Sequence, residues 1–185
     1  MWRRPLAHPT PPREVSAVTP PQRRRTLNAS SDDPGSLILH HWTRLSRLPA
    51  GRWLFHRLLG RMVPYTGALG ARVEELSPGH ARVSLADRRE VRNHLRSIHA
   101  VALVNLGELA TGLATLTALP PGVRGIVTEL SARYHAKARG RLETLCRIEG
   151  ELAPGETVEA VARITDASGR AVATVTALWT LGKAP

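Results

Sequence analysis

The chain has 185 residues, 26 basic against 15 acidic residues for a formal net charge of +11, and one cysteine. Its length fits one domain, and the single Cys146 excludes an internal disulfide and a multi-cysteine zinc site. Four Trp, two Tyr and one Phe are too few for the base-stacking platforms of single-stranded nucleic-acid-binding proteins. We therefore expect a cytoplasmic protein with an apolar core, no metal ion and no nucleic-acid partner.

The composition changes near residue 35. Residues 1–35 hold seven of the fourteen prolines and six arginines, and no apolar period is visible there. Such a segment buries too little apolar surface to offset the entropy lost on ordering. The sequence therefore predicts a disordered tail over residues 1–35 and one folded domain over residues 36–185. The basic tail leaves nucleic-acid binding as an alternative that rests on charge alone.

The first part of the predicted domain combines two short helices with a strand hairpin. Apolar residues recur at helical spacing over residues 37–48 and again over residues 53–60, with a Pro-Ala-Gly breaker between the two segments. Residues 67–76 and 80–86 read as strands on either side of a Ser-Pro-Gly turn. This pattern predicts helix, helix and β-hairpin in that order.

One long helical stretch follows, over residues 98–119, and a Pro-Pro-Gly sequence closes it. Four further strands come after the helix, at residues 124–134, 141–149, 157–165 and 171–181. Strands on both sides of a single long helix, joined by short connections, predict a mostly antiparallel sheet packed on that helix. The predicted fold class is therefore α+β.

The long helix carries one isolated charge. Its apolar residues form a continuous stripe suited to packing on a sheet: Ala102, Leu106, Leu109, Leu113 and Leu116. A second face carries the polar residues Asn105, Glu108, Thr111 and Thr115. Glu108 is the only ionisable residue between His99 and Arg124. A lone carboxylate in apolar surroundings is costly and often catalytic, although it could also lie at the helix rim beside water or an arginine.

The start of the helix offers a second chemical feature. His99 lies where unpaired backbone N–H groups and the helix dipole can polarise a carbonyl or hold an anion. Glu108 follows nine residues later, about 13.5 Å along the axis and half a turn around it. The two cannot flank one carbonyl within one chain. If both serve one reaction, each protomer must lend its carboxylate to the helix start of the other, so we expect a homodimer.

The residues Asn93, His99 and Glu108 resemble the hotdog-fold acyl-CoA thioesterases, in their PaaI-like (phenylacetate-pathway thioesterase-like) branch. That branch has an Asn, a His six residues later that opens a His-Gly-Gly motif, and an Asp or Glu nine residues after the His. Both spacings are kept here, and the resemblance covers residues 67–181. It implies an antiparallel sheet wrapped around the helix, an acyl-CoA substrate, a homodimer or a tetramer of such dimers, and no cofactor besides the substrate's coenzyme A.

The sequence departs from the family pattern at three positions. Ala100 and Val101 stand where the family usually has two glycines, and Arg96 stands where it usually has another. Glycine would let a thioester approach the backbone closely, so these side chains narrow the slot. The departures leave open the alternative of a non-catalytic hotdog domain that binds acyl-CoA or lipid.

The resemblance assigns a role to each residue of the candidate site. Glu108 would act as general base for water or as nucleophile, and the N–H of Ala100 would stabilise the oxyanion. Asn93 would orient the water or the carbonyl. His99 would position backbone, or would simply be satisfied by local hydrogen bonds. Thr111 would hydrogen-bond the carboxylate or the water, or would bond back to a helix carbonyl.

Basic residues provide candidates for the phosphates of coenzyme A. The predicted domain keeps 20 basic against 12 acidic residues. Those nearest the candidate site are Arg88, Arg89, Arg92, Arg96, Lys137, Arg139 and Arg141. From this set we expect Arg96, Lys137 and Arg139 to contact the ligand, against the alternative that they are solvated surface charges. Cys146 alternates with apolar residues and is expected to be buried.

Overall fold

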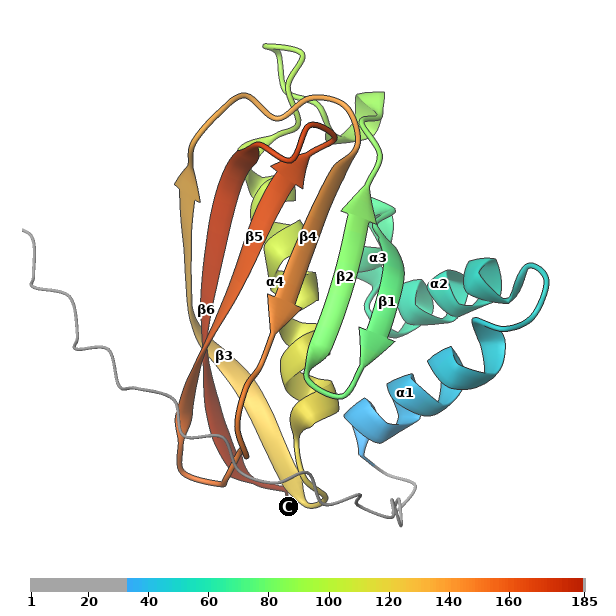
Figure 1. The fold of residues 1–185 in the computed structure, drawn as a ribbon, viewed down its shortest axis with the longest axis vertical. Helices are drawn as coiled ribbons and strands as arrows, with labels where there is room; N and C mark the ends of the chain where they lie inside the picture. Colours follow the sequence, from blue (N-terminus) through green and yellow to red (C-terminus); the bar gives the residue numbers. More distant parts are fainter. Residues whose placement is uncertain (1–32, 185) are drawn as a thin grey trace, which may run out of the picture.

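The computed structural model of the chain describes residues 33–184. Its elements are α1 (Pro34–Leu45), α2 (Gly51–Met62), α3 (Pro64–Leu69), β1 (Arg72–Ser77), β2 (His80–Leu85), the 3-10 helix η1 (Arg89–Val91), α4 (Ala100–Ala118), β3 (Val123–Tyr134), β4 (Leu142–Arg147), β5 (Thr157–Asp166) and β6 (Ala171–Lys183). The six strands form one antiparallel sheet in the order β1-β2-β4-β5-β6-β3, and α4 contacts every strand. Figure 1 shows the sheet laid over α4, with α1, α2 and α3 beyond β1. The α+β prediction is confirmed.

Helix α4 forms the centre of the core. Leu106, Leu109 and Leu113 of the predicted apolar stripe are buried. Gly107 allows the close contact with the sheet, because a Cβ there would lie 2.4 Å from Cβ of Val175 in β6. Helix α4 is long and apolar enough to span a bilayer, but 61% of its most apolar 18-residue stretch is buried inside the fold. That burial is typical of a core helix.

The predicted polar face of α4 is exposed only near the start of the helix. Thr111 and Thr115 are fully buried, so this face continues into the core instead of reaching solvent. Asn105 and Glu108, nearer the start of the helix, keep partial exposure. Because the sheet contacts α4 along so much of its circumference, helical periodicity alone could not separate a polar face from a buried one.

The region before β1 contains a helix that the sequence did not reveal. The prediction of a strand from residue 67 is wrong, because residues 64–69 form α3 and β1 begins at Arg72. Pro64 starts α3, and Gly70, at φ +66°, ends it in the left-handed conformation. A Cβ on Gly67 would lie 2.6 Å from the Cα of Gly60, so the two glycines let α3 fold back on α2.

Helix α1 begins slightly earlier than predicted. Asp33 caps it, since its Oδ2 accepts hydrogen bonds from the backbone N and the hydroxyl of Ser36, and Pro34 takes the first helical position. Helix α1 thus begins two residues before residue 36, where the sequence placed the start of the domain. The rest of the predicted tail, residues 1–32, lies outside the described residues, so its disorder stays a prediction.

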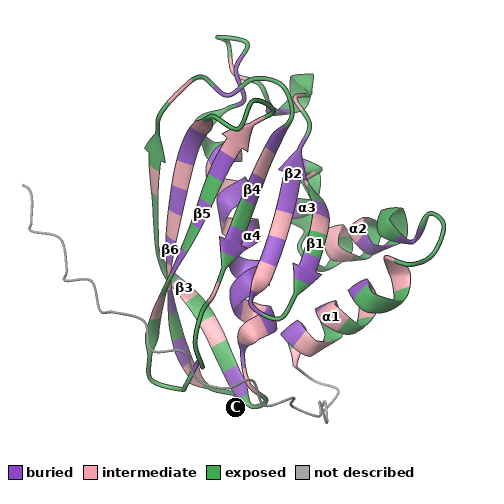
Figure 2. Ribbon diagram, viewed as in Figure 1, coloured by how far each residue is buried: buried purple, intermediate pink, exposed green. Residues whose placement is uncertain are grey.

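The two edge strands differ in cover. Strand β1 packs beside the N-terminal helices, which contact both it and α4. Strand β3 pairs along its length with β6 and has no second neighbour in the described part of the chain. Most of β3 is exposed or half-buried, as Figure 2 shows, and Ile126, Leu130 and Tyr134 are among its exposed side chains. The sheet thus presents one covered edge and one open edge.

Candidate active site

Glu108 lies in the third turn of α4 and is half-buried. Burial raises the pKa of its carboxyl group, and no donor or cation among residues 33–184 opposes that effect. The carboxylate therefore has the character of a base: it is desolvated, keeps its oxygens free and is partly accessible. The lone charge predicted in the helix is the one unpaired acid at the core of the fold.

Two residues that the sequence did not single out lie beside this carboxylate. A Cβ on Gly112, one turn further along α4, would lie 3.8 Å from Glu108 Oε1 and 3.4 Å from Cζ2 of Trp179 in β6. The indole Nε1 of Trp179 and the Oδ1 of Asn105 are both buried without a hydrogen-bond partner in the described structure. Polar atoms left unsatisfied in this way are costly, and Asn105 lies three residues before Glu108, on the same face of α4.

The start of α4 is held by His99. His99 is the N-cap residue, and its Nδ1 accepts a hydrogen bond of 3.1 Å from the N–H of Val101. This is the local satisfaction that the sequence left open, and it fixes the ring at the helix end. The neighbouring Ala100 is exposed, and its N–H has no acceptor within the part of the chain described. Ala100 therefore presents a free donor at the positive end of the α4 dipole.

Asn93 organises the loop that leads into α4. Its Oδ1 accepts hydrogen bonds from the N–H groups of Leu95 (2.9 Å) and Ser97 (3.2 Å), and its own N–H donates to the Ser97 carbonyl (2.8 Å). Only the amide Nδ2 is left to meet a ligand. Arg96 occupies the crest of this loop at φ +55°, a left-handed conformation that favours glycine. The backbone shape explains why glycine suits this position.

A groove of about 340 Å³ runs beside the start of α4. Its lining includes Asn93, Ala100, Tyr134 and Lys137, so three of the predicted site residues meet here. The Tyr134 hydroxyl donates to the Ala100 carbonyl at 3.3 Å, which ties the end of β3 to the helix start. The other predicted phosphate contacts, Arg96 and Arg139, are exposed but do not line this groove.

The predicted residues therefore fall into two places instead of one. Asn93, Ala100 and Lys137 share the groove, whereas Glu108 lies about 12 Å from Ala100 along the helix axis. Thr111 joins neither place, because it is fully buried and its hydroxyl donates to the backbone carbonyl of Glu108 at 3.0 Å. A contact between Thr111 and the carboxylate is thus not what the structure shows. The hydroxyl forms the back-bond usual for a helix threonine.

The model of one protein family matches residues 51–181, and that family is described as a domain of unknown function, DUF4442. The chain belongs to the DUF4442 family. No curated protein matches the sequence. Because the family has no assigned function, the site has to be interpreted through its geometry and through solved structures of similar fold.

Solved structures similar to this DUF4442 chain include proteins described as thioesterases. The structure of genomics APC5556 is 28% identical with a TM-score of 0.71, and the match covers 81% of this chain and 99% of that chain. A Pseudomonas aeruginosa protein of unknown function, described as a probable thioesterase, is 25% identical with a TM-score of 0.63, covering 74% and 97%. A thioesterase family protein from Silicibacter pomeroyi has 20% identity and a TM-score of 0.60, covering 70% and 96%. The predicted hotdog fold is confirmed, and the chain falls in the hotdog thioesterase superfamily.

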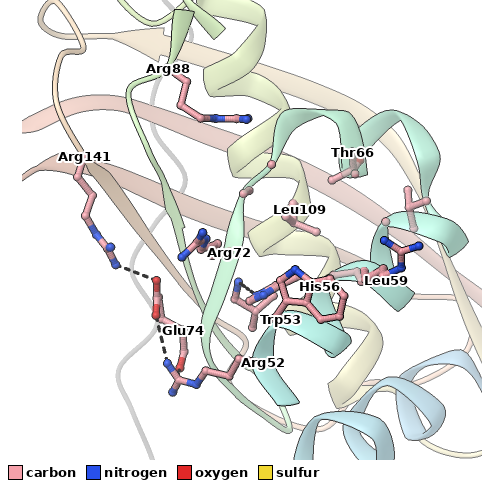
Figure 3. A pocket seen from close by; sticks show the side chains of 17 residues that line it. Arg52, Trp53, His56, Leu59, Thr66, Arg72, Glu74, Arg88, Leu109 and Arg141 are labelled. Carbon is pink, nitrogen blue, oxygen red and sulfur yellow. Dashed lines mark hydrogen bonds and ion pairs between the residues drawn. The ribbon is translucent and has the colours of Figure 1, made fainter. Parts of the chain in front are cut away.

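A larger cavity of about 550 Å³ lies on the other side of the DUF4442 domain, between α2, α3 and β1 (Figure 3). Its lining holds five arginines and one acidic residue, Glu74, which engages two of them. Glu74 accepts from Ser84 (2.6 Å) and Arg141 (2.8 Å) and pairs with Arg52 (3.4 Å). Burial alone would raise the pKa of Glu74, but these donors outweigh it and the pKa is lowered. Glu74 is therefore satisfied, while the cavity lining keeps an excess of positive charge.

Two of the basic residues considered for phosphate binding, Arg88 and Arg141, line this cavity instead of the groove. Arg88 donates to the Leu69 carbonyl at 2.6 Å, and Arg141 is held by Glu74. His56 accepts from the N–H of Val73 at 2.8 Å, and burial lowers its pKa, so the ring is neutral here. Residues 33–184 contain no group of three or more His, Cys, Asp or Glu that could hold a metal ion.

Proposed function

We propose that this DUF4442 domain is an acyl-CoA thioesterase, similar to the PaaI-like branch, that works as a homodimer with Glu108 as its general base. The observation that carries the proposal is the half-buried carboxylate of Glu108, which has no partner among residues 33–184 and a raised pKa, on the central helix of a hotdog fold. An acyl-CoA substrate and a cytoplasmic location belong to the same proposal.

The open edge of the sheet supports the dimer. Strand β3 is twelve residues long, and its outer backbone groups have no strand partner within residues 33–184. Ile126 is 67% exposed and Leu130 is 41% exposed, which is unfavourable for an isolated edge. Antiparallel pairing of two β3 strands about a two-fold axis would satisfy those backbone groups and extend the sheet across both protomers.

Such a pairing would also bring the two halves of the site together. The register places Trp179, the neighbour of Gly112 and Glu108, opposite Val127 in the first half of β3. The groove at the start of α4 lies at the other end of β3, beside Tyr134. If the two-fold axis passes near Leu130, the Tyr134 end of one strand meets the Val127 end of its partner. The carboxylate of one protomer then faces the Ala100 N–H of the other.

The chemistry follows from this arrangement. Glu108 takes a proton from water while the water oxygen attacks the thioester carbonyl carbon, which forms a C–O bond. The developing oxyanion accepts a hydrogen bond from the Ala100 N–H at the positive end of α4. The C–S bond then breaks, and the proton passes to the departing sulfur. The products are a free acid and coenzyme A.

In this arrangement Asn93 uses its free Nδ2 to orient the carbonyl, and its Oδ1 keeps the loop in shape. Lys137 in the groove, with Arg96 and Arg139 beside it, offers cations to the phosphates of the nucleotide end. His99 acts by holding the helix start through Val101 and takes no part in proton transfer.

Release of thiol from a panel of acyl-CoA esters tests the activity. We expect Glu108→Gln to lower kcat by 10² to 10⁴ fold, about the contribution of a general base, with little change in KM. Glu159→Gln, which alters an exposed carboxylate of β5, is the matched control and should keep full activity. Equal activity in the two variants would remove Glu108 from the mechanism.

The second candidate function, a non-catalytic acyl-CoA or lipid-binding domain, is favoured by one observation. The thioesterases of the PaaI-like branch usually have glycine at the position of Val101, which is 54% exposed here. A side chain therefore lies at the approach to the helix start. Saturable binding of a long-chain acyl-CoA to the wild-type protein, without thiol release from any ester of the panel, would favour this alternative over the enzyme.

A further inference from the structure

The N-terminal helices form a unit of uniform charge. Residues 34–71, which hold α1, α2 and α3, contain five arginines and three histidines but no acidic residue. All twelve acidic residues after Asp33 lie beyond residue 71. Arg52 pairs with Glu74 of β1, whereas Arg44, Arg47, Arg57 and Arg61 have no acidic partner in the described structure. The unit therefore presents a net positive surface that its neighbours do not neutralise.

The same unit exposes large apolar side chains. Trp53 is 63% exposed, Met62 is 53% exposed and Tyr65 is 72% exposed. Along α2, Trp53, Arg57 and Arg61 lie at successive i, i+4 positions on one line, and the guanidinium of Arg57 lies 5.7 Å from the Trp53 ring centre. The adjacent line carries Leu54, Leu58 and Met62. The outer face of α2 thus combines an apolar line with a cationic line, the pattern of a helix that lies in a membrane interface.

The position of α2 leaves this face accessible. Helices α1 and α2 extend outward from the β1 side of the sheet, and β3 lies at the opposite edge (Figure 1). A dimer that pairs through β3 therefore does not cover α2. Phe55 points into the core, so the helix is anchored by its inner face while its outer face stays free.

The charge decides what can cover the face. A second copy would bring arginines against arginines with no acid between them. Residues 1–32 of the same chain carry six arginines against two acids, so they too would be repelled. The occupant needs dense negative charge directly above an apolar layer, which is the structure of an anionic phospholipid surface.

We propose that the outer face of α2, with the start of α3, docks this domain on the surface of an anionic bilayer. Leu58 and Met62 of the apolar line enter the interface between headgroups and acyl chains together with Tyr65, where apolar side chains and amphipathic aromatic rings are favoured. Arg57 and Arg61 lie at the level of the headgroup phosphates and bind them. The helix lies on the membrane and does not cross it.

Co-sedimentation of the full chain with vesicles tests this proposal. We expect binding to phosphatidylcholine vesicles that contain phosphatidylglycerol, much weaker binding to pure phosphatidylcholine, and a loss of binding as salt is added. Arg57→Glu combined with Arg61→Glu should weaken binding by about 30-fold or more. Leu58→Ser combined with Met62→Ser should weaken it by about tenfold while leaving the charge unchanged.

The matched control is Arg147→Glu combined with Arg163→Glu, which makes the same change in net charge on exposed positions of β4 and β5. An equal loss of binding in this control would show attraction by net charge alone and would overturn the proposal. Full binding by the Leu58→Ser, Met62→Ser variant would overturn it as well, since a purely ionic contact with an acidic protein or nucleic acid needs no insertion. Hydrolysis of a short, soluble acyl-CoA should be unchanged in both α2 variants, so docking and catalysis are measured separately.

Discussion

Two carboxylates of the domain, Glu74 and Glu108, differ in their partners and in the direction of their pKa shifts. At the β1 edge, Glu74 accepts hydrogen bonds from Ser84 and Arg141 and pairs with Arg52, and its pKa is lowered. Toward the β3 edge, Glu108 has no such partner in the described residues, and its pKa is raised by burial. Both groups are carboxylates on regular elements of one core. Glu74 is thus satisfied within one chain, whereas Glu108 has no partner among the described residues, which is the feature that the proposed dimer would use.

Substitutions that block pairing of the open β3 edge should have the largest effect on thioester hydrolysis. In Ile126→Lys combined with Leu130→Lys, the charge at position 130 would face its copy at the two-fold axis, and the charge at position 126 would lie opposite the Tyr134 end of the partner strand. Both charges would oppose β3 pairing. We expect a monomer by sedimentation velocity and a loss of thioester hydrolysis of about 10²-fold or more, because the carboxylate loses the partner's oxyanion donor.

Val161→Lys combined with Leu145→Lys changes two exposed apolar residues of interior strands and serves as the control. It should keep both dimer and activity. A fully active monomer of the β3 variant would contradict the composite site.

Two glycines of the central helix α4 test how tightly it packs against the sheet. Gly107→Ala should lower the free energy of unfolding by about 1–3 kcal/mol, because the new Cβ would lie 2.4 Å from Val175 Cβ. Gly112→Ala meets only ordinary contacts beside Glu108 and Trp179, so the gain in helix propensity should leave stability equal or slightly higher. Urea denaturation of the two variants measures the difference. Equal destabilisation would mean that helix packing does not distinguish the two glycines.

The pH dependence of stability should have opposite signs at the two carboxylates. The folded-state pKa of Glu108 is raised, so the ionised carboxylate destabilises the folded state at neutral pH. Below the unfolded-state pKa the group is protonated in both states, and this destabilisation disappears. Glu108→Gln should therefore be more stable than wild type near neutral pH, and the gain should vanish as the pH falls. The folded-state pKa of Glu74 is lowered, so Glu74→Gln should lose about 1 kcal/mol near neutral pH, and this loss should shrink in acid.

Thermal unfolding over a series of pH values measures both curves. Parallel curves for the two variants would contradict the contrast between a partnered and an unpartnered carboxylate. The activity of the wild type should fall as the pH drops through the raised pKa of Glu108, since the protonated form cannot accept a proton from water.

The smallest effect is expected at Cys146, which lies in β4 between the two edges. It is 1% exposed, and burial raises its pKa to about 11. Cys146 should therefore not react with a thiol reagent at pH 8 until the protein is unfolded. Rapid labelling of the folded protein would show that this part of the sheet opens readily.

Much of the fold was readable in local patterns. Alternation of apolar residues predicted the strands, and the run of apolar residues ending at Pro-Pro-Gly predicted α4 to within two residues at each end. The isolation of Glu108 and its distance from His99 follow from the sequence and helix geometry alone. Segment 64–69 was misread, because its helix is defined by Pro64 and Gly70 at its ends and by packing on α2 more than by any period.

The sequence by itself determined most of the elements, with α3 as an exception, and that one acid stands alone in the central helix, since both are properties of neighbouring residues. Only the tertiary structure decided that β6 and β3 are neighbours, that Trp179 lies beside Gly112, and that Thr111 turns to a backbone carbonyl. It also decided that Glu74 is satisfied while Glu108 is not. Periodicity specifies which way a side chain faces, but its partner depends on strand order and packing between residues far apart in the chain.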